Sequence, residues 1–156
     1  NPAGKVPVIE DDGSVIADSN AILVYLARKY APDWLPTDPE GEAEVQKYLS
    51  FAASEIAYGP AAARLVTVFG AKLDAERAKA VAEGAFRWLE GRLEGREWLA
   101  GGRPSIADVA VYSYTAHAPE GNVSLEPYPN IRAWLARVAA LPGFTPMRAT
   151  PVGLAS

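Results

Sequence analysis

The first thirty residues contain two short apolar runs followed by one helical pattern. Residues 6–10 and 14–17 are rich in valine and isoleucine, and the Asp-Asp-Gly sequence between them favours a tight turn, so they predict a β-hairpin. From residue 19 to residue 30, apolar side chains recur every three or four positions, which predicts a helix. A hairpin with one helix is marginal alone. We therefore expect these pieces to belong to a larger sheet whose other strands come earlier.

Prolines separate this segment from a remainder that is helical throughout. The stretch 31–39 holds three prolines and no periodicity, which predicts a linker over 32–39. Apolar stripes with helical spacing then follow within 45–56, 74–93, 105–116 and 129–141. Gly59-Pro60 predicts a kink or a break, because proline removes a helix hydrogen bond. The expected organisation is a partial α/β domain over 1–31, a linker over 32–39 and a five-helix domain over 40–156.

The helix predicted from residue 105 to about residue 116 has almost no polar face. Such a helix is normally buried in the middle of a bundle, and we expect Tyr112 and Tyr114 in the core. Ser105 stands three residues before Asp108, which is the spacing of a capping box. A structural cap explains Asp108 better than a catalytic role does. His117 has no serine or aspartate at a catalytic spacing, so we interpret it as a helix-end residue.

Composition narrows the classes of function. Hydrophobic residues make up 49% and charged residues 22% of the 156 positions, which is ordinary for a globular domain. The net charge is −4 and no run of five like charges occurs, which argues against nucleic acid or an acidic membrane as partner. The chain has no cysteine and one histidine, so thiol chemistry and a multi-histidine metal site are excluded within it. These features, with no membrane span or signal peptide in the sequence, predict a cytoplasmic domain.

Four segments of the chain resemble one protein family. They are 1–9 (NPAGKVPVI), 18–27 (DSNAILVYLA), 105–108 (SIAD) and 128–135 (YPNIRAWL) with the LPGF of 141–144. In this order and spacing they resemble cytosolic glutathione transferases of the bacterial type, over essentially the whole chain. The resemblance implies a mainly α fold. It would comprise the C-terminal part of a thioredoxin-like α/β domain, lacking its N-terminal part, followed by the family's all-α C-terminal domain.

The resemblance also implies where the thiol chemistry lies. The family begins with a β-α-β unit, at least roughly 30 residues long, that carries the tyrosine, serine or cysteine activating the thiol of glutathione. We expect that unit upstream of Asn1. Within residues 1–156 we assign no catalytic residue and no metal ligand.

By the same resemblance, glutathione binds at Lys5, Val6, Pro7, Asp18 and Ser19. The Val6–Pro7 bond is expected to be cis, and the backbone of Val6 would pair with the glutathione peptide as an added strand does. Ser19 and the helix N-terminus would hold the γ-glutamyl carboxylate, Asp18 the ammonium group, and Lys5 the glycyl end. Simpler interpretations are an edge-strand proline, a helix N-cap and a solvated lysine.

Three residues of the first long helix are weaker candidates. Ser54, Tyr58 and Arg64 fall where bacterial relatives contact glutathione across a dimer or line the pocket of the acceptor substrate. Helix residues of these types more often lie at the surface or in packing contacts, so both interpretations stay open.

The resemblance implies a glutathione transferase that adds the glutathione thiolate to a small hydrophobic electrophile, as in detoxification. Glutathione would be a co-substrate, and the protein would be a homodimer. Relatives on the same fold reduce peroxides, dehalogenate or isomerise, and the sequence does not separate these activities. The alternative is a non-catalytic interaction module of the same fold. A helical scaffold without any ligand is a third hypothesis, which the ordered motifs disfavour.

Overall fold

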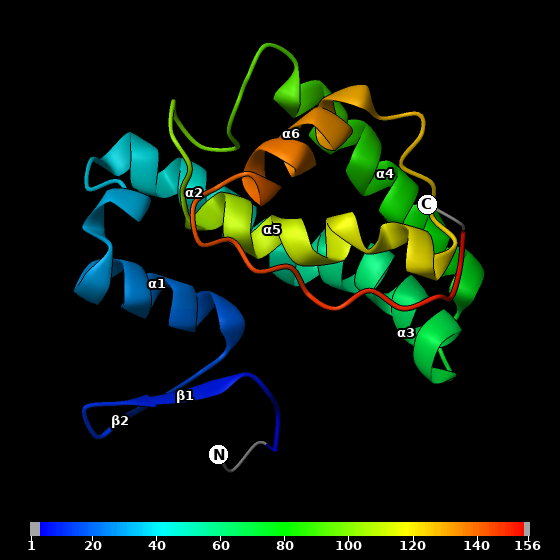
Figure 1. Cartoon of the computed structure of the whole chain (residues 1–156), viewed down its shortest axis with the longest axis horizontal. Helices are drawn as coiled ribbons and strands as arrows, with labels where there is room; N and C mark the ends of the chain where they lie inside the picture. The colour runs from blue at the N-terminus through cyan, green and yellow to red at the C-terminus, as the bar shows by residue number, and fades with distance from the viewer. Residues whose placement is uncertain (1–3, 155–156) are drawn as a thin grey trace.

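The computed structural model describes residues 4–154 as a small hairpin beside a helical bundle (Figure 1). The elements are β1 (Val8–Asp11), β2 (Ser14–Ala17), α1 (Ser19–Tyr30), η1 (Pro32–Trp34), α2 (Pro39–Phe51), η2 (Ala52–Ala61), α3 (Ala62–Phe69), α4 (Ala75–Leu93), α5 (Ile106–Ala116), η3 (Ala118–Gly121) and α6 (Pro129–Ala139). This arrangement confirms the predicted fold class, which is mainly helical with a small sheet. Within residues 4–154, no helix is both long and apolar enough to cross a membrane.

The hairpin forms as predicted, except that its first strand spans Val8–Asp11 instead of residues 6–10. β1 and β2 are antiparallel, and Asp11 pairs with Ser14 at the closed end. The two residues between them, Asp12 and Gly13, have φ angles of 49° and 76°, as a two-residue hairpin turn requires. The turn sequence therefore fixes the register of the ladder.

One carboxylate fastens the hairpin to α1. Asp11 accepts hydrogen bonds from Lys29 Nζ and Tyr25 Oη, both at 2.9 Å, and from Tyr30 Oη at 2.7 Å. The Lys29 hydrogen bond, followed by that from Tyr30, lowers the pKa of Asp11 to about 2. The three donors stand on the last turns of α1, so this network sets the angle between the helix and the sheet.

The chain from Pro39 to Phe69 is one continuous helical run made of α2, η2 and α3. The break that Gly59-Pro60 could have caused does not occur. The hydrogen-bond pattern instead widens to a π-helix over η2, the segment that contains Pro60. Gly59 is needed for packing, since a Cβ there would lie 2.8 Å from the backbone nitrogen of Ala82 on α4. The close approach of η2 to α4 explains the glycine.

The core lies among α2, α4, α5 and α6, around the fully buried Tyr48, Phe86 and Trp134. α2 begins at Pro39 with Asp38 as N-cap, and α4 begins after the N-cap Asp74. Both starts lie within one residue of those that the sequence pattern predicts, because proline and aspartate mark helix N-termini locally.

Candidate functional site

A cleft of about 670 Å³ lies between the hairpin with the start of α1 on one side and the bundle on the other. The hairpin side is lined by Pro7, Ile9, Asp18, Ser19, Asn20, Ile22 and Leu23; the bundle side by Ala52, Ala53, Ala57, Ala61 and Leu65 of η2 and α3, and by Val109, Ala110, Ser113 and Tyr114 of α5. The polar groups are concentrated on the hairpin side, and the opposite wall is largely apolar. A ligand with one polar and one apolar part would match both walls.

The hairpin wall begins at the Val6–Pro7 peptide bond, which is cis. Val6 is 91% exposed and stands outside the ladder, which starts at Val8. The carbonyl oxygen of Pro7 accepts a hydrogen bond from the backbone nitrogen of Asp18 at 3.3 Å. This bond brings the Val6–Pro7 backbone beside the start of α1.

Asp18 is the N-cap of α1 and has an unusual backbone. Its Oδ1 accepts from the backbone nitrogens of Asn20 and Ala21 at 2.9 and 3.0 Å. Its φ is 80°, a conformation that costs a residue with a Cβ about 1–3 kcal/mol and is concentrated at functional sites. Oδ2 accepts no hydrogen bond from the residues that the structure describes, so one carboxylate oxygen is left for a ligand.

Ser19 is the first residue of α1 and lies exposed in the cleft. Its hydroxyl makes no hydrogen bond within the described part of the chain, and its backbone N–H points from the positive end of the helix dipole. Asn20 holds this end of α1 against the bundle, because its Nδ2 donates to the carbonyl of Leu49 at 2.9 Å. The cleft therefore presents an available hydroxyl and an available amide at a fixed helix N-terminus.

The bundle wall corrects one expectation about α5. Val109 is 40% and Tyr114 41% exposed, and both line the cleft. The helix is apolar on all sides because one face packs in the core while another forms the apolar wall, so the expectation that Tyr114 is buried is wrong. Tyr112 is half-buried and packs edge-on against Trp134 and Phe144.

Comparison with known proteins identifies the family. The family model named glutathione S-transferase, C-terminal domain matches residues 36–142, and the model of the N-terminal domain matches residues 1–29. The chain belongs to the glutathione transferase family.

Individual relatives agree with this assignment. Human glutathione S-transferase theta-2 is 33% identical over 92% of this chain and 63% of the relative. Glutathione S-transferase D7 of Anopheles gambiae is 32% identical over 86% of this chain and 63% of the relative. The crystal structure of a glutathione S-transferase from Xanthobacter autotrophicus Py2 is 36% identical, with a TM-score of 0.84 over 94% of this chain and 73% of that one. This chain thus spans about 63% of the length of both curated relatives.

Of the residues expected to bind glutathione, Pro7, Asp18 and Ser19 come together in the cleft. Lys5 and Val6 are exposed and directly precede Pro7, so they lie beside the cleft rather than in its lining. Across residues 4–154 there is no cluster of three or more histidine, cysteine, aspartate or glutamate side chains that could hold a metal ion.

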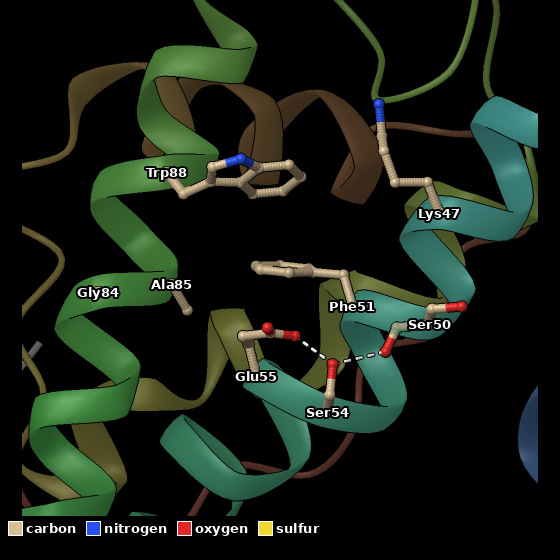
Figure 2. Close-up of a pocket in the computed structure, with 8 residues that line it drawn as sticks. All are labelled: Lys47, Ser50, Phe51, Ser54, Glu55, Gly84, Ala85 and Trp88. Carbon is tan, nitrogen blue, oxygen red and sulfur yellow. Dashed lines mark hydrogen bonds between the residues drawn. The ribbon is translucent and has the colours of Figure 1, made fainter.

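The structure places Ser54, Tyr58 and Arg64 outside the cleft lining. Ser54 lines a separate hollow of about 470 Å³ between α4 and the helical run of α2 and η2, where Phe51 and Trp88 face each other with ring centroids 4.7 Å apart (Figure 2). Tyr58 is 72% exposed. Arg64 is buried, and its Nε donates to Glu120 Oε2 at 2.7 Å.

The residues that line the bundle wall were not found from the sequence. Ala53, Ala57 and Ala61 look like an ordinary small-residue stripe of a helix, and Leu65 and Val109 look like core positions. The one available signal was the excess of apolar positions on α5. A helix that is apolar on more than one face needs an apolar surrounding on each, and here these are the core and the cleft.

The capping box of α5 is present in full. Ser105 Oγ accepts from the backbone nitrogen of Ala107 at 3.2 Å, and Asp108 Oδ2 accepts from the backbone nitrogen of Ser105 at 2.9 Å. Asp108 is fully buried, does not line the cleft, and its bonds are all to its own helix start, to Leu99 and to Trp134. Its position supports a structural role.

Proposed function

We propose that the protein is a glutathione transferase that binds glutathione along the hairpin wall of the cleft and an apolar electrophile along the bundle wall. The observation that carries the proposal is the pairing of these two walls across one cleft of about 670 Å³. The family match supports it. The cytoplasmic location, the homodimeric state and the division into domains at 31 and 40 stay predictions.

On the hairpin wall, each part of glutathione has a complementary group. The γ-glutamyl carboxylate fits the hydroxyl and N–H of Ser19 at the positive end of α1. The γ-glutamyl ammonium fits Oδ2 of Asp18, and the peptide backbone fits the exposed backbone of Val6, which extends the edge of β1. Lys5 is close enough in sequence to reach the glycyl carboxylate.

On the bundle wall, small side chains leave room for an acceptor. Ala53, Ala57 and Ala61 recur every four residues along η2 and line the bundle wall together with Val109 and Tyr114 of α5. An apolar electrophile held there would lose its hydration and lie next to the thiolate of glutathione, which is the nucleophile of the transfer. The cleft residues thus contribute binding and orientation.

Substitution of Ser19 by alanine tests the glutathione site in the full-length protein. Because Asp18 and not Ser19 caps α1, the substitution should leave the melting temperature nearly unchanged. Losing a hydrogen bond to a charged group, about 1.5–3 kcal/mol, should weaken glutathione binding by roughly 10- to 150-fold in calorimetric titration. The KM for the electrophile at saturating glutathione should change little.

Ser113→Ala is the matched control, because Ser113 lines the opposite wall of the same cleft. It should leave glutathione affinity intact. If Ser19→Ala and Ser113→Ala have equal affinity for glutathione, the assignment of Ser19 is wrong. An absence of any glutathione binding in the wild-type protein would favour the alternative, a non-catalytic interaction module.

A further inference from the structure

A buried polar cluster joins three parts of the chain outside the cleft lining. Glu120 of η3 is 6% exposed; Arg64 of α3 and His117, which ends α5, are 8% and 9% exposed. Arg64 Nε donates to Glu120 Oε2 at 2.7 Å, and His117 Nδ1 lies 2.6 Å from Glu120 Oε1. The two remaining bonds to Glu120 come from Thr150, near the end of the chain: its backbone nitrogen donates to Oε1 at 3.1 Å and its Oγ1 to Oε2 at 2.8 Å.

Thr150 belongs to an extended segment, residues 145–154, that we call the strap. The strap follows α6, passes along α5 and ends near α3 (Figure 1). At its far end Leu154 donates its N–H to the carbonyl of Pro119 at 2.9 Å. Gly153 has φ +92°, and a Cβ there would lie 2.3 Å from Pro119 O, so this end sits directly on η3. Between residues 145 and 149 the strap is exposed and makes no hydrogen bond to other described residues.

The exposed part of the strap borders a third pocket, of about 280 Å³, that we call the strap pocket. Its walls include Trp34 and Tyr112, and Phe144, Thr145 and Met147 border it from the strap side. Val109 and Ser113 of α5 line both the strap pocket and the cleft. The two pockets therefore lie on adjacent sides of one helix.

Thr150 of the strap differs from the other partners of Glu120, because the charge of Glu120 stays paired without it. If the strap leaves, Glu120 keeps Arg64 and His117, which both belong to the bundle, so no buried charge is left without a partner. The cost of opening is then only the bonds that Thr150 and Leu154 make and the apolar contacts of the strap. A buried charge that stays paired in both states suits a reversible contact better than a permanent one.

We propose that Glu120 is a latch that holds the strap over the strap pocket, and that release at Thr150 opens an aromatic binding site for an apolar ligand beside the cleft. Under the proposed function, this site would receive the part of a long acceptor that extends past Val109 and Ser113. The latch itself does not depend on glutathione.

Native-state proteolysis tests the latch in the intact protein. Arg148 is the only lysine or arginine between residue 138 and the end of the sequence, and it lies in the exposed part of the strap. Trypsin should cut after Arg148 whenever the strap opens. Thr150→Val removes the hydroxyl bond to a charged acceptor, and we expect cleavage at this site to become about tenfold faster, as followed by mass spectrometry.

Thr145→Val is the matched control, since its side chain makes no hydrogen bond with the described residues and it stands in the same strap. Its cleavage rate should equal that of the wild type. Cleavage sites in the bundle, such as Arg87 of α4, report global unfolding and should not accelerate in either variant. Equal rates at Arg148 in the two threonine variants, or a parallel increase at bundle sites, would overturn the latch.

The binding site is tested with 8-anilinonaphthalene-1-sulfonate as an apolar aromatic probe, without glutathione. Thr150→Val should bind the probe several-fold more tightly than the wild type, and Trp34→Phe in the Thr150→Val background should lower energy transfer from tryptophan to the probe. Unchanged probe binding in Thr150→Val would overturn the ligand site while leaving the cleavage result to stand. Because no step uses glutathione, failure here is distinct from failure of the Ser19 experiment.

Discussion

Two carboxylates are buried in the helical bundle, and they are held in opposite ways. Asp108 is fully buried and accepts from two backbone nitrogens, those of Leu99 and Ser105, and from Trp134 Nε1 at 2.8 Å. These donors are neutral. Glu120 is almost as deeply buried, but one of its partners is the guanidinium of Arg64.

The electrostatics of the two groups differ accordingly. Burial raises the pKa of Asp108, and its hydrogen bonds with Trp134, Leu99 and Ser105 offset that effect only in part. Burial also raises the pKa of Glu120, but hydrogen bonds from His117, Thr150 and Arg64 outweigh it and lower the pKa to about 2. A buried carboxylate that is held mainly by backbone donors can reduce the cost of its burial only by taking up a proton. A buried carboxylate that is held by side chains can be exchanged for an apolar residue if its side-chain partner is exchanged as well.

The largest effect is expected at Asp108. Asp108→Ala leaves three buried donors without an acceptor, at about 1–3 kcal/mol each, so the free energy of unfolding should fall by on the order of 5 kcal/mol. Denaturant unfolding measures this. Ser105→Ala, which removes the other half of the capping box, should cost only about 1 kcal/mol. Equal losses for the two variants would show that Asp108 acts only as a helix cap, and that its contacts with Leu99 and Trp134 do not stabilise the bundle.

A smaller effect is expected at Glu120, and it should be reversible by a second substitution. Glu120→Met leaves the buried Arg64 without its anion and should cost about 3 kcal/mol. The double variant Glu120→Met with Arg64→Met should recover at least about half of that loss, because an apolar pair of similar volume replaces a desolvated ion pair. A double-variant cycle measures the recovery. If the double variant is less stable than Glu120→Met alone, the proposed difference between the two carboxylates is wrong.

The two buried carboxylates, Asp108 and Glu120, also differ in how far the sequence predicts their contacts. The serine and aspartate of the capping box are three residues apart, so local spacing is sufficient to predict the contact and the helix start. The ion pair of Arg64 and Glu120 joins residues 56 positions apart, and nothing in either local pattern indicates the other. The sequence analysis therefore placed Arg64 with the acceptor or dimer residues, whereas the structure shows it inside the bundle.

The same distinction between local and distant signals holds for the fold and the cleft. The turn at Asp12-Gly13 and the bounds of α1 follow from local rules, and the structure reproduces both. The continuous helix through Gly59-Pro60 depends on the close approach of α4, which local rules do not contain. The exposed face of α5 likewise depends on the cleft, and a hydrophobic side chain that faces a ligand site looks the same in sequence as one in the core.

The smallest and most diagnostic effect is the pH dependence of what Asp108 and Glu120 each contribute to the free energy of unfolding. Glu120 has a folded-state pKa of about 2 against an ordinary value of 4.5, so the unfolded chain binds more protons between these values and the stability from Glu120 is lost as the pH falls through that window. Asp108 has a raised folded-state pKa against an ordinary 3.8, so its contribution grows as the pH falls toward 3.8 and is constant below it.

Unfolding curves of the wild type, Glu120→Gln and Asp108→Asn between pH 6 and pH 2.5 separate the two contributions, because other acids such as Asp11 are common to all three proteins. The difference in unfolding free energy between the wild type and Glu120→Gln should shrink with acidification, while that between the wild type and Asp108→Asn should widen and then level off. Two differences that change in the same direction would mean that the hydrogen bonds from His117, Thr150 and Arg64 do not keep Glu120 charged, and the contrast between the two carboxylates would fail.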